Sequence, residues 1–162
     1  MDSNHQRSME LESVRRLEEK GVSYKLLELK EKAFTVEDVV KFAKDVINRN
    51  EICKTIILKD EDGNKYAVLL LGNHRIDFSK MRDAIRRKLS IASYKEVIEE
   101  TGIEPGAVCP LILEIPLFID RRVLDMRRVN FGSGDHLYGL EISPNDLDIV
   151  INFKVIDIAN TM

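Results

Sequence analysis

Two apolar runs with a turn between them constrain the fold of this chain more than any other feature. Residues 53–59 and 65–71 are rich in isoleucine, leucine and valine, and the segment Asp60–Asn64 between them contains an Asp-Gly pair. Apolar runs separated by a few residues that include glycine are typical of a β-hairpin. The sequence therefore predicts two adjacent antiparallel strands, which excludes an all-helical fold.

The rest of the chain mixes short helix and strand patterns without regular alternation. Capping residues predict helix starts at Ser8, Thr35, Ser79, Ser93 and Ser143. We expect helices to end near Gly21, Ala43, Leu89 and Thr101, and strands over 22–29, 75–77, 117–120, 129–131, 137–142 and 150–158. The apolar stripe from Val36 to Ala43 should be buried. This mixture predicts the α+β class, with a curved, mixed but largely antiparallel sheet flanked by helices.

Length and composition predict one domain over residues 1–162. The chain is 44% hydrophobic and 33% charged, and its longest apolar runs, 66–71 and 108–113, are too short to cross a bilayer. The polar N-terminus contains no apolar stretch of a secretory signal, so we expect a cytoplasmic protein without a membrane partner. A formal net charge of -3 argues against bulk binding of nucleic acid, and no DNA partner is expected.

The two cysteines do not form a recognisable framework. Cys53 and Cys109 are too few for a disulfide scaffold, and no close cysteine or histidine gives either of them metal-ligand spacing. We therefore expect neither a metal nor a cofactor.

The segment Thr101–Pro110 contains four glycine or proline residues and follows a helical pattern. Gly102 suits the position after a helix end, while Pro105 and Gly106 favour a turn. A loop of this kind exposes backbone N–H groups, and a glycine lets a carbonyl or phosphate oxygen approach them closely. A simple connecting turn is the alternative interpretation.

Two further clusters contain groups that could take part in chemistry. Lys54 begins a strongly apolar strand pattern, where an ammonium group can bind a phosphate or a carbonyl; a solvated lysine at a strand end is the alternative. The run Gly132–His136 places Asp135 and His136 after an unusual turn, where they could orient a water or a substrate group. Its alternative is a hairpin turn with polar side chains.

Arginines are concentrated in two segments. Arg82, Arg86 and Arg87 lie in a predicted helix, and Arg127 and Arg128 belong to a later basic segment. Such runs are usually solvated faces, but Arg82 and Arg86 share one helix face that could contact a phosphate backbone. We expect Arg82, Arg86 and Arg87 to be the preferred RNA-binding group, with Arg127 and Arg128 second.

Several of these motifs occur together in one known family. The sequence resembles the YbaK and prolyl-tRNA-synthetase-associated editing family of aminoacyl-tRNA deacylases, from the Thr35 helix to the Pro144 helix. The resemblance lies in Lys54-Thr55 before aliphatic residues, the Asp-Gly hairpin, an Arg-Ile-Asp after it, Thr-Gly-x-x-Pro-Gly-x-x-x-Pro over 101–110, and Gly-Ser-Gly-Asp-His over 132–136.

The resemblance implies a twisted mixed sheet with flanking helices, and hydrolysis of the ester between a mischarged amino acid and the terminal adenosine of tRNA. It implies Lys54 as the central residue of the catalytic site. It also implies that a loop fixed at Gly106 and Pro110 positions the ester, facing a wall that contains His136. By the same resemblance the substrate-binding residues are Thr55, Ala107, Val108, Cys109, Pro110, Gly132, Ser133, Gly134 and Asp135. Ala107 and Cys109 depart from the glycine and serine common in the family, which changes the expected pocket size.

The chemistry of an aminoacyl ester fits these residues. The ester is already activated, so positioning and stabilisation of the developing oxyanion can suffice, with backbone amides near Gly106 and the cation of Lys54 as suitable groups. The attacking water could be oriented by the terminal ribose hydroxyl, as the family implies. The expected partner is the acceptor end of mischarged tRNA, met in trans either through the arginines or through an aminoacyl-tRNA synthetase.

Two other functions remain open from the sequence. One is a cysteine hydrolase with Cys109 as nucleophile and His136 as base, although no helix N-terminus or fixed cation near Cys109 would lower the pKa of its thiol. The other is a non-catalytic regulator whose pocket binds a nucleotide or an aminoacyl adenosine.

Overall fold

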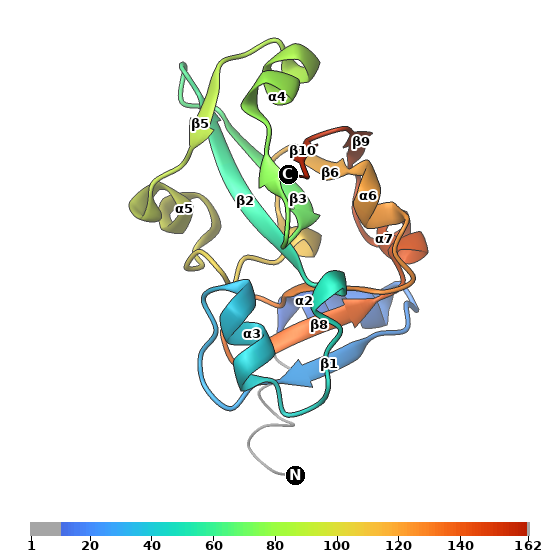
Figure 1. Cartoon of the computed structure of the whole chain (residues 1–162). Helices are drawn as coiled ribbons and strands as arrows, with labels where there is room; N and C mark the ends of the chain where they lie inside the picture. The colour runs from blue at the N-terminus through green and yellow to red at the C-terminus, as the bar shows by residue number, and fades with distance from the viewer. Residues whose placement is uncertain (1–10, 162) are drawn as a thin grey trace.

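The computed structural model describes residues 11–161 (Figure 1). Its α-helices are α2 (Glu12–Glu19), α3 (Val36–Phe42), α4 (Phe78–Ile85), α5 (Tyr94–Thr101), α6 (Arg121–Leu124) and α7 (Leu147–Val150), with 3-10 turns η1 (Arg49–Glu51), η2 (Pro110–Ile112) and η3 (Pro144–Asp146). The strands are β1 (Lys25–Glu28), β2 (Cys53–Asp60), β3 (Lys65–Leu71), β4 (Arg75–Ile76), β5 (Leu89–Ile91), β6 (Leu117–Asp120), β7 (Val129–Gly132), β8 (Tyr138–Ile142), β9 (Lys154–Ile156) and β10 (Ala159–Asn160).

The predicted hairpin is confirmed as β2 and β3. The two strands pair antiparallel from Cys53 opposite Leu71 to Lys59 opposite Lys65. The carboxylate of Asp60 organises the turn, because it accepts hydrogen bonds from the backbone N–H of Asn64 at 2.9 Å and from the side-chain amide of Asn64 at 2.9 Å. These bonds, the side-chain bond first, lower the pKa of Asp60 to about 2.

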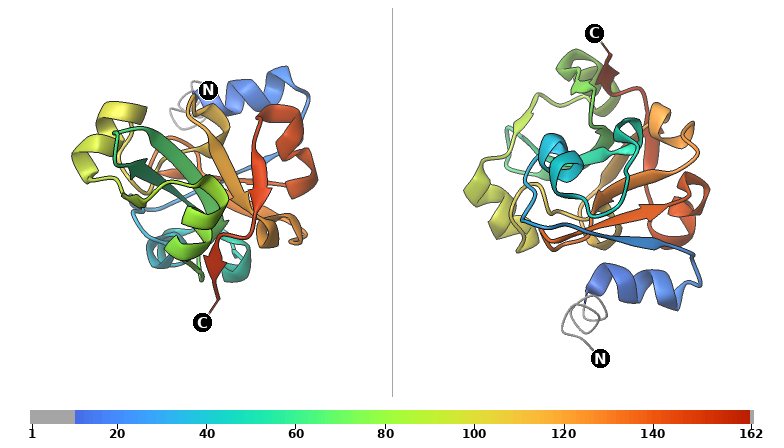
Figure 2. Two further views of the ribbon diagram at one scale, coloured as in Figure 1. Left: turned by 90° about the horizontal axis from the view of Figure 1, so that it is seen from above. Right: turned by 60° about the horizontal axis from the view of Figure 1, so that its bottom comes forward.

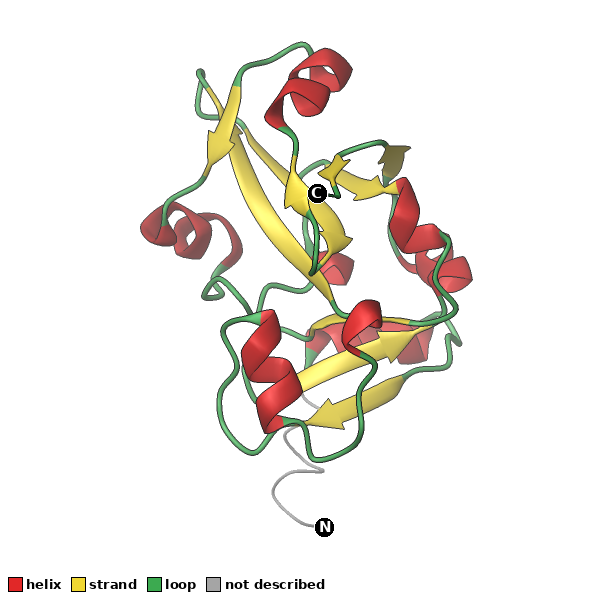
Figure 3. Ribbon diagram, in the orientation of Figure 1, coloured by secondary structure: helices red, strands yellow, loops and turns green. Residues whose placement is uncertain are grey.

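The strands form a mixed but largely antiparallel arrangement with helices around it, which confirms the predicted α+β class (Figure 3). The largest sheet has five strands in the order β5-β2-β3-β6-β9, in which β6 runs parallel to both β3 and β9. An antiparallel sheet β1-β8-β7 and the pair β10-β4 complete the described strands, so there are three sheets rather than one. A bridge between Ile52, the residue before β2, and Asn130 of β7 connects the hairpin to the three-stranded sheet.

Both faces of the five-stranded sheet are buried. Side chains from one face, including Ile57 and Leu69, belong to a core that also contains Val97 of α5. Leu58 and Leu70 point to the other face and pack with Met81 of α4. Alternating residues of one hairpin thus supply two cores, since successive side chains of a strand point to opposite faces. Figure 2 shows α2 on the outer side of the three-stranded sheet.

Several predicted boundaries are confirmed and others are wrong. Thr35 caps α3, and Ser93 with Glu96 forms a capping box at α5. The helix α4 is capped by Asp77 rather than Ser79, because the Asp77 carboxylate accepts from the N–H groups of Ser79 and Lys80. Ser8 lies outside the described residues, and the described helix α2 begins after Leu11 without a side-chain cap.

Two segments adopt structures that the sequence patterns did not predict. The helix expected to reach Leu89 ends at Ile85, because Arg86 is left-handed with φ 65°, and β5 follows. The strand expected over 150–158 is divided into the end of α7, β9 and the residues that lead to β10. No helix in residues 11–161 is long and apolar enough to cross a bilayer.

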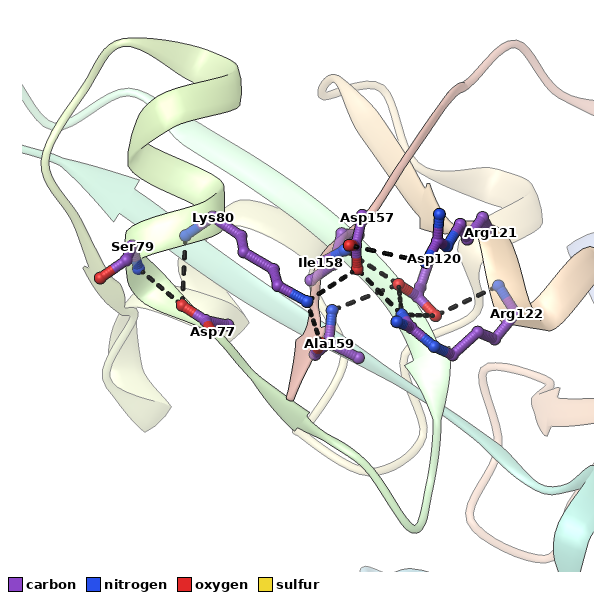
Figure 4. A network of polar contacts seen from close by, with 9 residues as sticks. All are labelled: Asp77, Ser79, Lys80, Asp120, Arg121, Arg122, Asp157, Ile158 and Ala159. Carbon is purple, nitrogen blue, oxygen red and sulfur yellow. Dashed lines mark hydrogen bonds and ion pairs between the residues drawn. The ribbon is translucent and has the colours of Figure 1, made fainter. Parts of the chain in front are cut away.

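A buried carboxylate fixes the C-terminal segment (Figure 4). Asp120 is fully buried, and its Oδ1 accepts hydrogen bonds from the N–H groups of Ile158 at 2.9 Å and Ala159 at 3.2 Å. Arg122 Nη1 lies 3.0 Å from both Asp120 Oδ1 and Asp157 Oδ1. Hydrogen bonds from Arg122, and then from Lys80, lower the pKa of Asp157. This network joins β6, α4 and the β10 segment.

Candidate functional site

A cavity of about 530 Å³ lies beside the part of β2 that β5 does not cover. The strand β5 pairs with β2 only from Leu58 to Asp60, so the edge of residues 53–57 faces the cavity instead of a neighbouring strand. The other walls come from the segment 33–39, the loop at 105–108, β7, the 135–139 segment, and residues 91–97. Most of these side chains are apolar.

The helix α3 covers this cavity rather than a core. Val36 and Val39 line the cavity, Val40 is 39% exposed, and α3 has no buried residue. The prediction of a buried stripe from Val36 to Ala43 is therefore wrong. The periodicity was correctly assigned to a helix, but its apolar face lies over a hollow space.

Lys54 places a cation in the cavity wall. Its side chain is half-buried, and Nζ donates a hydrogen bond to the carbonyl oxygen of Gly72 at 3.3 Å. Burial, and then the nearby charge of Arg75, lowers the pKa of Lys54. A partly desolvated ammonium next to an apolar cavity interacts strongly with an anion or a developing negative charge, because water screens it poorly.

The loop over 101–110 brings Gly106 to the cavity. Gly106 has φ +96°, a conformation that other residues rarely adopt, and a Cβ there would lie 2.7 Å from the carbonyl oxygen of Phe34. Both the backbone conformation and the lack of space therefore require glycine at this position. The N–H group of Gly106 has no hydrogen-bond partner within the described part of the chain. Gly106 is therefore a residue of the cavity lining with an unpaired backbone donor.

The run over 132–136 packs directly against this loop. A Cβ on Gly132 would lie 2.7 Å from the carbonyl oxygen of Val108, and the N–H of Gly134 donates to the carbonyl of Ala107 at 2.8 Å. The hydroxyl of Ser133 is buried and donates to the carbonyl of Tyr138 at 2.7 Å. The two motifs that the sequence separates by more than 20 residues thus form one wall.

His136 is held at the cavity by three contacts. Its Nδ1 lies 2.9 Å from the carbonyl oxygen of Ala33, which can only accept, so Nδ1 carries the proton. The centroid of its ring lies 4.3 Å from the centroid of the Phe34 ring, and its Nε2 lies 3.7 Å from the carboxylate of Glu104. Nε2 of His136 and Oγ1 of Thr55 are both buried without a hydrogen-bond partner in the described structure.

The structure divides the predicted site residues into two groups. Those that line the cavity are Lys54, Thr55, Gly106, Val108, Gly132, Asp135 and His136. The others are not part of its lining: Ala107, Cys109, Pro110 and Ser133, which are buried, and Gly134, which is partly exposed. Ala107 and Cys109 therefore do not set the size of the cavity directly, contrary to the expectation from their departure from the family pattern.

Cys109 does not have the surroundings of a nucleophile. It is fully buried in the core, and burial raises the pKa of its thiol to about 12. A nucleophilic cysteine needs a populated thiolate and access to its substrate, and Cys109 lacks both. No group of three or more potential metal ligands occurs among residues 11–161 either.

Several residues of the cavity belong to none of the sequence motifs. Asn130 is 4% exposed and contributes to the wall from β7, although a polar residue inside an apolar strand pattern was a usable signal. Phe34, Val36, Val39 and Ile91 line the cavity too. Nothing in their local patterns distinguishes them from ordinary core residues, because their role depends on segments that are distant in sequence.

The predicted RNA-binding arginines lie away from the cavity. Arg82 is in the last turn of α4, which packs on the face of the five-stranded sheet opposite the core of Val97 and Val108. Arg87 forms an ion pair with Asp62 at 3.2 Å, which reduces its availability. Figure 1 shows α4 and α3 at opposite ends of the molecule.

Comparisons with known proteins agree on one family. A family model described as an aminoacyl-tRNA editing domain matches residues 30–149. The chain is 28% identical over 126 residues to a proline--tRNA ligase of Persephonella marina, which is 78% of this chain and 21% of the ligase. It is also 26% identical over 103 residues to the uncharacterized protein YwhH of Bacillus subtilis, which is 62% of this chain and 66% of YwhH.

Solved structures agree with this assignment. The hypothetical protein APE2540 superposes with a TM-score of 0.82 at 30% identity, covering 92% of this chain and all of that one. A protein proposed to be a trans-editing enzyme for prolyl tRNA synthetase superposes with a TM-score of 0.77 at 25% identity, covering 92% of this chain and 98% of that one. This chain spans about a fifth of the length of the ligases it matches. Since the family model covers most of the chain and includes every residue that lines the cavity except Leu29, the chain belongs to the aminoacyl-tRNA editing domain family.

Proposed function

We propose that this protein hydrolyses the ester bond of mischarged aminoacyl-tRNA in trans. The observation that supports this proposal best is the half-buried ammonium of Lys54 in the wall of a mostly apolar cavity, with Gly106, whose N–H is unpaired within residues 11–161, in the same wall. An apolar space can take the amino-acid side chain, while the two donors can stabilise negative charge on the ester.

The reaction needs few groups from the protein. Water attacks the carbonyl carbon of the ester, the carbonyl oxygen takes up negative charge, and the ribose oxygen leaves with a proton. The N–H of Gly106 donates to the developing oxyanion, and Lys54 stabilises the negative charge of the oxyanion or of the adjacent phosphate. The ribose hydroxyl next to the ester orients the water, so no protein nucleophile takes part.

Action in trans is supported by one similar structure. A protein proposed as a trans-editing enzyme for prolyl tRNA synthetase superposes with a TM-score of 0.77 and shares 25% of its sequence with this chain. The partner of this chain is then the acceptor end of a mischarged tRNA, reached directly or through a synthetase that holds the same tRNA.

A panel of charged tRNAs tests the proposal. We expect the purified protein to release the amino acid from one or a few mischarged tRNAs and to leave correctly charged tRNAs intact, as measured by the loss of labelled aminoacyl-tRNA over time. Binding of aminoacyl-tRNA without release above the spontaneous rate would contradict hydrolysis and favour the non-catalytic regulator.

Replacing Cys109 by serine should leave deacylation within about twofold of wild type, because its buried side chain does not reach the cavity. The amino-acid preference should not change either. The unfolding temperature should change little, because the backbone N–H of Leu111 and the hydroxyl of Ser13 beside this side chain can hydrogen-bond a buried serine. Prolonged treatment of the wild type with a chelator is the parallel control. Loss of activity at equal folded fraction in either experiment would support a thiol or metal mechanism.

Replacing Arg82 and Arg86 together by alanine should weaken binding of tRNA and flatten its salt dependence. The logarithm of the binding constant falls with the logarithm of the salt concentration, with a slope of about 0.7 to 0.9 per phosphate contact. Because few phosphates are contacted, the affinity of the wild type for tRNA should fall only modestly between low and physiological salt. Hydrolysis of a minimal aminoacyl-adenosine ester should hardly change, because this substrate does not extend to α4. Equal losses on both substrates would show that these arginines support the fold instead.

A further inference from the structure

Phe34 is an exposed aromatic residue at the cavity. Eight large hydrophobic side chains are exposed among residues 11–161, and such residues are ordinary on a protein surface when they are isolated. Only Phe34, which is 49% exposed, and Ile91, which is 57% exposed, also line the cavity. Apolar surface is therefore left open at the rim of the proposed ester site.

The position of Phe34 is fixed from several sides. Its N–H donates to the carboxylate of Asp38 at 3.0 Å, and its carbonyl lies so close to Gly106 that no side chain fits between them. Its ring rests against the ring of His136, with 40° between the planes. The ring is thus oriented before any ligand binds, which reduces the entropy lost on binding.

The substrate of the proposed reaction brings a flat group to this place. The ester is attached to the ribose of the last, unpaired nucleotide of tRNA, so the nucleobase lies only one sugar away from the carbonyl group. If the ester lies at Gly106, the base lies within one sugar of the loop that Phe34 directly contacts, and the exposed ring of Phe34 is within its reach. Unpaired bases commonly stack on exposed aromatic side chains, and this contact tolerates any base.

We propose that Phe34 is the stacking surface for the 3′-terminal nucleobase of the tRNA, with Ile91 as a second apolar contact. This inference rests on the proposed function, because it takes the cavity as the ester site. In this proposal the rim of the cavity binds the unpaired nucleobase, and the interior of the cavity binds the amino-acid side chain. Hydrolysis of the ester and stacking of the base can be measured independently.

An uncharged RNA minihelix that ends in an unpaired 2-aminopurine provides a direct test. The fluorescence of this base is quenched when it stacks, so the wild type and Phe34→Tyr should quench it at saturation, whereas Phe34→Leu should not. Phe34→Leu should also weaken binding of this RNA at least about fivefold, the lower end of the range for one stacked base. A second minihelix that lacks the terminal nucleotide should bind wild type and Phe34→Leu with similar affinity.

Phe78→Leu is the matched control, because Phe78 is also an exposed phenylalanine, 38% exposed, at the first position of α4 on the other face of the sheet. Any loss it causes should be equal for the two RNAs. The inference is overturned if the wild type binds both RNAs with equal affinity, or if Phe34→Leu weakens binding of both RNAs equally. It is also overturned if sedimentation shows that the wild type is a dimer and that Phe34→Leu is a monomer, because Phe34 would then contact a second copy of the chain. Absence of deacylation with intact quenching would contradict the proposed reaction and leave the stacking role standing.

Discussion

Replacing Lys54 by alanine is expected to lower the rate of deacylation at least about a hundredfold, with little change in the unfolding temperature. Lys54 is half-buried in the cavity wall, so its charge acts through poorly screened surroundings. Loss of one preorganised electrostatic group in an active site typically costs about a hundredfold to a thousandfold. Single-turnover rates on a saturating mischarged tRNA measure this loss without a contribution from binding.

Lys59→Ala is the matched control for this variant. Lys59 lies on the same strand but pairs with Glu96 at 2.8 Å, away from the lining of the cavity. Its variant should deacylate at close to the wild-type rate. The pKa of Lys54 is lowered, so the wild-type rate should also fall as the pH rises through this pKa, earlier than for a free lysine. Full activity of Lys54→Ala would remove Lys54 from the mechanism.

Replacing Asp120 by alanine is expected to destabilise the fold by about 3 kcal/mol or more, because two backbone donors then lose their buried acceptor. These donors are the N–H groups of Ile158 and Ala159. Arg122 would keep Asp157 as a partner, which limits the loss. Urea unfolding followed by circular dichroism measures the difference.

Two further variants separate the causes of this loss. Asp120→Asn keeps one oxygen for the two N–H groups and should cost less than Asp120→Ala. Asp157→Asn changes a side chain that is 37% exposed and should cost under about 1 kcal/mol, as is usual for exposed ion pairs. Equal stability of Asp120→Ala and wild type would show that the network in Figure 4 contributes nothing measurable.

The features that the sequence predicted well are those determined by neighbouring residues. The hairpin at Asp60–Asn64, the Thr35 cap and the Ser93 capping box each depend on a few adjacent side chains, and all are confirmed. Arg86 shows the limit of this reasoning. Its left-handed conformation ends α4 without a glycine, and no local propensity announces it.

The cavity could be predicted only in part, because its walls come from distant segments. Motifs identified Lys54, Gly106 and His136, which all line it. Phe34 and Asn130 belong to no motif and reach the cavity through the packing of α3 and β7. The motif predicted that Cys109 faces the cavity, but Cys109 is buried in the core. A motif gives the order of residues along a loop and does not say which of them face the core.

The covering position of α3 has a consequence for how such proteins can diversify. Val36 and Val39 line the cavity, yet α3 contributes no buried residue to either core. Substitutions at these positions should therefore reshape the binding space at little cost in folding free energy, whereas substitutions in β2 would affect both. A preference for a different substrate amino acid can then evolve through substitutions in α3 while the sheets stay unchanged.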